Sequence, residues 1–168
     1  HAAFGWILDT FIYFGGYPGG VDLIGDEARW KSYVRESLVE TTISRDVLFL
    51  KRIDKPGLLR QLMALATLYS GQIVSFTKLL GQLQDSGNTT IISDYLQLLE
   101  GVGMVSGLQK HSTSGIRRRA SSPKLQVWNT GLLTSIASHG FAAARADGVF
   151  WGHLVESCVG AHLLNTTR

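Results

Sequence analysis

Residues 54–101 read DKPGLLRQLMALATLYSGQIVSFTKLLGQLQDSGNTTIISDYLQLLEG. Apolar residues recur in this stretch at intervals of three and four, which predicts three amphipathic helices. Their expected inward positions are Leu59, Leu62, Met63, Ala66 and Tyr69, then Phe76, Leu79, Leu80 and Leu83, then Ile91, Ile92, Tyr95, Leu96 and Leu99. Asp54 and Ser75 are predicted to cap the first two helices, and Gly71 and Gly101 to follow the ends of the first and third.

Short strand-like runs flank the polar segment that follows the third helix. Residues 104–109 and 124–128 are predicted to pair as a β-hairpin, and Ile73-Val74 is long enough for a stub of strand. Three helices followed by a hairpin are the order of a winged helix-turn-helix. The predicted fold class is therefore mainly α with a small β-hairpin.

Together with its flanking sequences, this stretch divides the chain into three predicted parts. Residues 1–53 are expected to form a helical linker region, with a helix from Asp26 in which Asp26 is the N-cap and Glu27 and Lys31 form an exposed ion pair. Residues 54–128 form the winged-helix domain, and residues 129–168 begin a further α/β unit. Its last helix is expected to present one apolar face, made of Trp151, Val155, Cys158, Val159 and His162.

Composition limits the class of protein. The chain has 168 residues, of which 45% are hydrophobic and 17% charged, a balance typical of a globular domain. Its single cysteine excludes an internal disulfide and favours a reducing, cytoplasmic location. No segment has the length of apolar sequence that a membrane span needs, so no membrane partner is expected. The chain begins with His1, which suggests a piece of a larger protein.

Several short strings together resemble one family. They are Tyr13-Phe14-Gly15-Gly16-Tyr17-Pro18, Ser44-Arg45-Asp46-Val47, Ser70-Gly71-Gln72, Asp94-Tyr95-Leu96-Gln97-Leu98-Leu99, Ser122-Pro123-Lys124-Leu125, Asn129-Thr130-Gly131-Leu132 and Gly152-His153-Leu154-Val155-Glu156. In this order they resemble the prokaryotic AAA-type P-loop ATPases that end in the domain of unknown function family 4143. Asn129 departs from the pattern, since that family usually has an aspartate there.

The resemblance implies an ATPase core before this chain, a winged helix within it, and a truncated nuclease-like unit at its end. ATP and magnesium would belong to that missing core, which would also be a partner of this chain. The phosphate-binding string G-x-x-x-x-G-K-[ST] does not occur here. The chain by itself is therefore expected to be a non-catalytic C-terminal module without a cofactor of its own.

Charge is unevenly distributed along the chain. Residues 1–100 have a net charge of −2, whereas residues 101–168 have a net charge of +5. The basic residues of the predicted wing are Lys110, His111, Arg117, Arg118, Arg119 and Lys124. Such a cluster can neutralise phosphates, so the sequence predicts contact with the backbone of double-stranded DNA, supplemented by Asn88 and Thr89 at the start of the third helix.

Several alternatives to DNA binding stay open at this point. The basic segment is also compatible with a solvated loop or with a surface that contacts an acidic face of the core. The second functional hypothesis is a protein–protein interaction or oligomerisation module without nucleic-acid binding, which includes a homo-oligomer. A metal-dependent nuclease is the third, and it requires residues beyond those in this chain.

Four further residues are candidates for functional sites. Arg45 is a candidate contact for a nucleotide phosphate, against the alternative of a local ion pair. Glu156 matches the helix carboxylate of nuclease-like folds, but a single carboxylate does not hold a catalytic metal. Cys158 and His162 stand four residues apart, yet two ligands do not make a zinc site. No metal site is therefore predicted.

Overall fold

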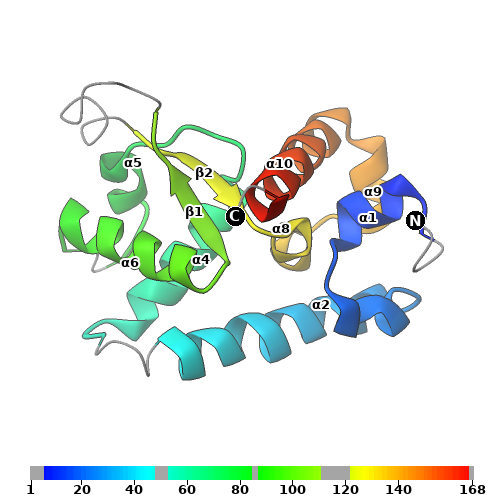
Figure 1. The fold of residues 1–168 in the computed structure, drawn as a ribbon, viewed down its shortest axis with the longest axis horizontal. Coiled ribbons are helices and arrows are strands. Elements are labelled where there is room, and N and C mark those ends of the chain that lie inside the picture. Colours follow the sequence, from blue (N-terminus) through cyan, green and yellow to red (C-terminus); the bar gives the residue numbers. More distant parts are fainter. Residues whose placement is uncertain (1–5, 48–52, 85–86, 111–121, 167–168) are drawn as a thin grey trace. The chain divides into compact units, whose positions relative to one another are not determined.

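The computed structural model describes residues 6–47, 53–84, 87–110 and 122–166. The chain forms two compact units. The first unit consists of His1–Thr42 together with Val127–Arg168, and the second unit is Ile43–Gln126. The described chain is mostly helical with one two-stranded antiparallel sheet (Figure 1), which confirms the predicted fold class at this level. The predicted boundaries at residues 53 and 128 stay a prediction.

The second unit contains the stretch that carries the helical periodicity. Its elements are η3 Thr42–Val47, α4 Pro56–Leu68, α5 Phe76–Leu80, α6 Thr89–Gly101, β1 Val105–Leu108 and β2 Lys124–Val127, of which the end residues Thr42 and Val127 belong to the first unit. Ser75 caps α5 as predicted, because its side chain accepts a hydrogen bond from the Lys78 amide. The expectation that Asp54 caps α4 was wrong. The N-cap is Lys55, without a side-chain cap bond, because the helix begins at Pro56, which suits the first helical position since it has no N–H that would need a partner there.

The core of the second unit is built from the predicted apolar positions. The side chains of Leu59, Leu62, Ile92 and Leu99 are fully buried. Helix α6 packs against α4, α5 and β1, so the third amphipathic helix is the centre of the unit. The 3.6-residue period therefore placed the buried side of each helix correctly.

Three backbone segments lie next to one another in the second unit. Strand β2 pairs with β1 on one side, and on its other side residues 71–74 run antiparallel to it, with Ile73 opposite Lys124. The amide of Val74 donates to the Pro123 carbonyl at 3.0 Å, and the amide of Leu125 donates to the Gln72 carbonyl at 2.9 Å. The predicted strand stub is thus the edge of a three-segment arrangement in which β2 is central.

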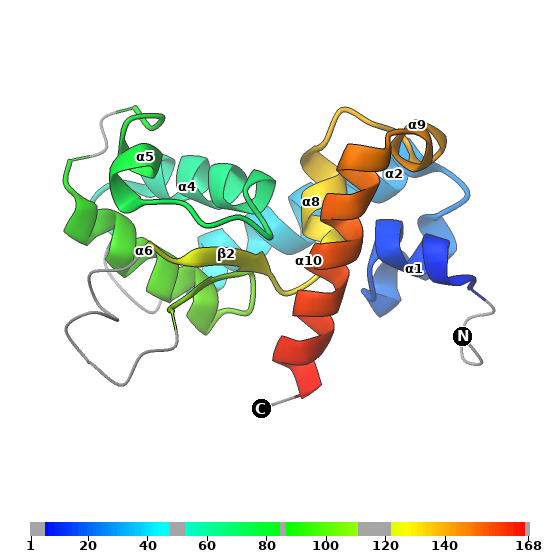
Figure 2. The same cartoon turned by 90° about the horizontal axis from the view of Figure 1, so that it is seen from above.

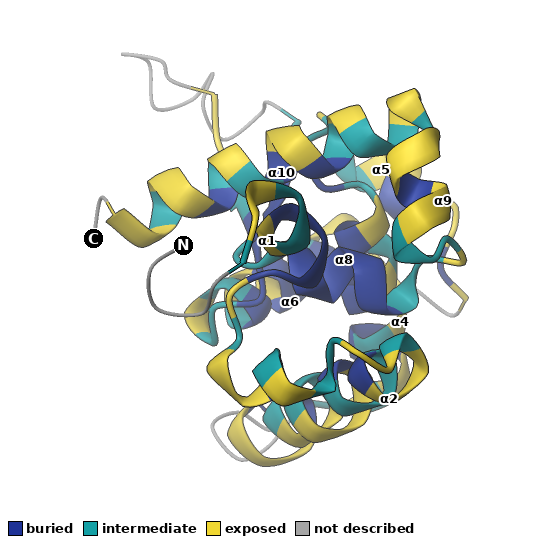
Figure 3. Ribbon diagram, turned by 90° about the vertical axis from the view of Figure 1, so that its right-hand side faces the viewer, coloured by how far each residue is buried: buried dark blue, intermediate teal, exposed yellow. Residues whose placement is uncertain are grey.

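The first unit joins two distant stretches of sequence. Its elements are α1 Leu8–Phe14, η1 Pro18–Leu23, α2 Glu27–Ser32, η2 Tyr33–Glu40, α8 Thr130–Ile136, α9 Phe141–Ala146 and α10 Gly148–Thr166. Asp26 caps α2 as predicted, and η2 follows α2 with π-helical hydrogen bonding. Helix α8 lies in the middle, where it packs against α1, α2, η2 and α10 (Figure 2), and Figure 3 shows it dark blue along most of its length.

Two glycines allow the two stretches of the first unit to approach closely. Gly15 has a φ of 70°, a left-handed conformation that favours glycine. Any Cβ there would collide with the Oδ1 atom of Asn129, which caps α8 by accepting a hydrogen bond from the Gly131 amide at 2.9 Å. A Cβ on Gly131 would in turn lie 2.8 Å from the Phe14 carbonyl oxygen. The backbone contact between residues 14–15 and α8 therefore requires glycine on both sides.

The orientation of α10 differs from the expectation. Its buried residues are Leu154, Ser157 and Ala161, whereas Val155 and Val159 of the predicted face are 37% and 55% exposed. The prediction failed because apolar residues occur all round this helix, so periodicity does not identify the packed side. The small residues Ser157 and Ala161 lie on the packed side, where they permit close approach.

Candidate functional site

The start of α6 presents polar groups on the surface of the second unit. Asn88 is the N-cap, and its Oδ1 atom accepts a hydrogen bond from the Ile91 amide at 3.0 Å. Thr89 is exposed next to it. Further along the helix Asp94 and Gln97 are also exposed, and α6 contains no lysine or arginine. This end of α6 can donate hydrogen bonds to an anion, but the exposed helix face carries no positive charge.

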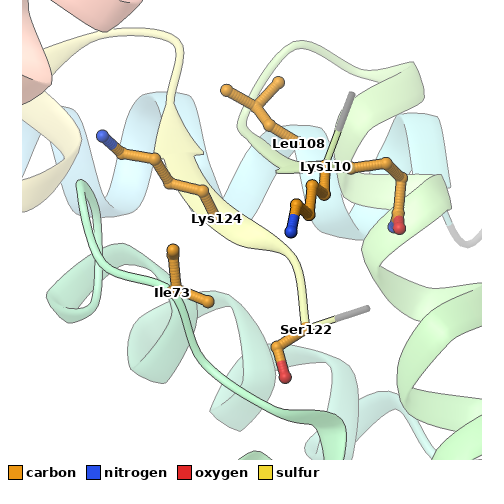
Figure 4. Close-up of a pocket in the computed structure, with 6 residues that line it drawn as sticks. Ile73, Leu108, Lys110, Ser122 and Lys124 are labelled. Atoms are coloured by element: carbon orange, nitrogen blue, oxygen red, sulfur yellow. The ribbon is translucent and has the colours of Figure 1, made fainter. Parts of the chain in front are cut away.

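Lys110 and Lys124 lie at the ends of the two strands. Lys110 is exposed two residues after β1, and Lys124 is the first residue of β2. Both line a hollow of about 530 Å³, together with Ile73, Leu108, Gln109 and Ser122 (Figure 4). This set of six is called the sheet hollow below. The structure thus brings two of the predicted basic residues to one place.

The other predicted basic residues are Arg45, which the structure describes, and four residues that it does not describe. Arg117, Arg118 and Arg119, as well as His111, lie outside the described residues. Arg45 is exposed on η3. Its neighbour Ser44 accepts a hydrogen bond from the Arg60 guanidinium at 3.2 Å. The contact of Arg45 with a nucleotide and the contact of the α6 start with DNA stay predictions.

The candidate metal-binding residues on α10 do not form a cluster. Glu156 and His162 are exposed, and Cys158 is half-buried. Burial raises the pKa of the Cys158 thiol, which disfavours the thiolate that would bind a metal. No group of three histidine, cysteine, aspartate or glutamate side chains suited to a metal occurs within residues 6–47, 53–84, 87–110 and 122–166.

A polar network in the first unit was missed by the sequence reasoning. The Tyr13 hydroxyl donates to Glu27 Oε1 at 2.6 Å, and the Phe141 amide donates to Glu27 Oε2 at 3.0 Å. Lys31 pairs with Glu27 at 3.2 Å and also donates to the carbonyls of Ala137 and His139.

The Glu27–Lys31 pair was predicted as exposed. It is instead partly buried, because the segment around residue 140 folds over it. Its contacts tie α2 to residues 137–141, which is a structural role.

Acid is expected to destabilise the first unit through Glu27. Burial acts to raise its pKa, but the hydrogen bonds from Tyr13, Phe141 and Lys31 outweigh that effect and lower it. A carboxylate whose folded pKa is depressed stabilises the fold above its unfolded pKa of about 4.3, and this contribution is lost as the pH falls toward the folded value. Urea unfolding between pH 7 and pH 3 should therefore show a falling midpoint.

The variant Glu27→Gln tests the source of this pH dependence. It should be less stable than the wild type at pH 7. Its urea unfolding midpoint should also depend less on pH below about pH 4.3, since its amide does not titrate there. Glu36→Gln, on the exposed side of η2, is the matched control and should keep the wild-type profile. Identical pH profiles for Glu27→Gln and the wild type would contradict the assignment.

Within the described residues, no helix combines the length and apolarity that a membrane span requires. Comparison with curated proteins and with solved structures finds no match.

The resemblance to the ATPases that end in family 4143 was wrong. A model of a different family matches residues 6–142, and nothing in it links the chain to ATPases. The short strings misled because local geometry explains some of them. Asn129 and Gly131, for example, are a helix cap and a close-packing glycine, which unrelated proteins also need. The match covers most of the chain, so the protein belongs to the family described as Domain of unknown function (DUF8612).

Proposed function

We propose that this chain is a non-catalytic module whose second unit is a winged helix that binds double-stranded DNA, mainly through the phosphate backbone. The arrangement of α4, residues 71–74, α5, α6, β1 and β2 supports it. Residues 71–74 pair with the far side of β2, and this is the observation that carries the proposal, because a strand segment that lies between the first two helices and joins the hairpin is the connectivity expected of a winged helix. A cytoplasmic location fits such a module.

Backbone contact is favoured over base reading. The wing would supply Lys110, Lys124 and Arg117–Arg119, while Asn88 and Thr89 would supply hydrogen bonds at the start of α6. The exposed side of α6 carries Asp94 and no cation, so it offers none of the arginine or lysine contacts that commonly read guanine. Binding should therefore show little sequence preference and a strong dependence on salt.

Removal of three wing arginines should weaken binding. The variant Arg117→Ala/Arg118→Ala/Arg119→Ala is expected to bind a non-specific duplex at least about tenfold more weakly at low salt. Its slope of log affinity against log salt should fall by up to about 2.7, since each neutralised phosphate contributes about 0.9. Fluorescence anisotropy at several salt concentrations measures both quantities.

A control variant separates this effect from net charge. Arg29→Ala/Arg35→Ala/Lys78→Ala removes the same charge from three exposed positions outside the wing and should keep most of the wild-type slope. Equal affinity of the wild type and the wing variant would overturn the proposal for the wing.

A second candidate function is protein–protein interaction. It is favoured by apolar side chains that remain exposed in the first unit, since Leu8 is 69% exposed on α1 and Leu163 is 56% exposed on α10. Helices α1 and α10 pack against each other, and contiguous apolar patches on a surface often mark interfaces. Light scattering that shows self-association while DNA binding is absent would favour this candidate.

A further inference from the structure

The sheet hollow combines apolar and cationic side chains. Figure 4 shows that Ile73, Leu108 and Lys124 come from three neighbouring backbone segments, with Lys110 and Ser122 beside them. Ile73 is 73% exposed, although it is a large aliphatic residue on a paired segment. Leu108 is half-buried across β2 from it. These two side chains lie on either side of Lys124 in the same hollow (Figure 4), and each offers apolar surface that a ligand would cover favourably.

Both charged residues among the six that line the hollow are lysines. Its polar lining consists of two lysines, the Gln109 amide and the Ser122 hydroxyl, and it includes no carboxylate. Lysine ammonium groups and hydroxyl or amide hydrogens are donors, so they would bind the head of an anionic ligand. The volume of about 530 Å³ falls within the range of small-molecule sites.

We infer that the sheet hollow binds a small amphipathic anion, namely an aliphatic chain that ends in a carboxylate or a phosphate. The aliphatic part packs on Ile73 and Leu108, and the anionic head is held by Lys110 and Lys124, with hydrogen bonds from Gln109 or Ser122. This inference shares Lys110 and Lys124 with the proposed DNA contact, but it does not depend on DNA binding, because the apolar contact with Ile73 has no role in holding phosphates.

Four probe molecules test the aliphatic chain and the anionic head of the ligand separately. Decanoate and decyl phosphate carry both a chain and an anion, decanol carries only the chain, and inorganic phosphate carries only the anion. Titration of the wild-type chain, followed by calorimetry or by amide NMR shifts, should show either amphipathic anion binding at least about tenfold more tightly than decanol and phosphate. The tighter of the two anions identifies the head group, and added salt should weaken its binding.

Two substitutions locate the site. Ile73→Glu places a carboxylate in the hollow at a mostly exposed position, so the unit should fold normally while affinity falls by about tenfold or more. Lys110→Gln removes one charge and should weaken anion binding by a few-fold, without an effect on decanol. Circular dichroism checks that both variants are folded.

The controls lie in the same unit but outside the hollow. Leu68→Glu changes an aliphatic residue that is 51% exposed on α4, and Lys78→Gln changes an exposed lysine on α5. Both should bind the anions as the wild type does. The inference is overturned if neither anion binds at about 1 mM, or if Ile73→Glu binds as tightly as Leu68→Glu.

Discussion

Replacement of Gly15 by alanine is expected to destabilise the first unit by about 3 kcal/mol. Two effects add. The φ of 70° is strained for any residue with a Cβ, and the new methyl group would displace the Asn129 side chain from its capping position on α8. Loss of that cap also frees the Gly131 amide within a part-buried contact. Urea unfolding followed by circular dichroism measures the change.

A second glycine provides the matched control. In α10, a Cβ on Gly152 would meet nothing within 4 Å, so Gly152→Ala should stabilise the helix by roughly 0.5–1 kcal/mol through its helix propensity. The same chemical change should thus have opposite signs at the two positions. The assignment of the close approach at Gly15 fails if Gly15→Ala unfolds at the same urea concentration as the wild type.

Removal of the Trp30 side chain should cost about 4 kcal/mol, because it leaves a large cavity in the first unit. Trp30 is only 1% exposed, and its ring packs edge-on against Phe14 with centroids 5.0 Å apart. The Tyr13 ring is a further neighbour at 6.3 Å. Trp30→Phe should recover part of the stability, since it keeps an aromatic ring in the cluster.

Substitution of an exposed apolar residue is the control for Trp30→Ala. Leu163→Ala on α10 removes a side chain that is 56% exposed and should change the stability by less than about 0.5 kcal/mol. Trp30→Ala and Leu163→Ala with equal unfolding free energies would show that the aromatic cluster is not the core of this unit. Circular dichroism is the suitable probe, because the substitution removes a fluorescent residue.

Local patterns predicted the second unit well. Helices α4, α5 and α6 pack through neighbours three and four residues apart, and this spacing is visible in the sequence around Leu59, Leu79 and Ile92. The strands of the hairpin were also located, because polar residues separate two apolar runs. The pairing of Ile73 with Lys124 was not predicted, since nothing local links positions so far apart.

The first unit was less predictable because its contacts are long-range. Glu27 and Lys31 were expected to pair, but the partners that bury them come from residues 137–141. The segment around Gly15 contacts Asn129 for the same reason. A helix with apolar residues on every side, such as α10, gives no periodic signal for the face that packs.

The candidate site was only partly predictable. Lys110 and Lys124 were named from their charge and their place in the hairpin, and they do lie together in the sheet hollow. The apolar half of the hollow was not foreseen, because Ile73 was interpreted as an ordinary strand residue. Its exposure becomes visible only when the neighbouring segments are in place.

The first unit is made of two separate stretches of sequence, so its two parts are synthesised at different times. Residues 6–42 leave the ribosome before α8 exists, so Gly15 lacks Asn129, and Trp30 lacks the α8 part of its packing, until residue 136 has been made. At about 5–20 residues per second, this delay lasts roughly 5 to 20 seconds. The helices and strands of the second unit are synthesised within that time. Folding of the second unit would shorten the segment that separates the two stretches of the first unit, and so lower the entropy cost of bringing them together.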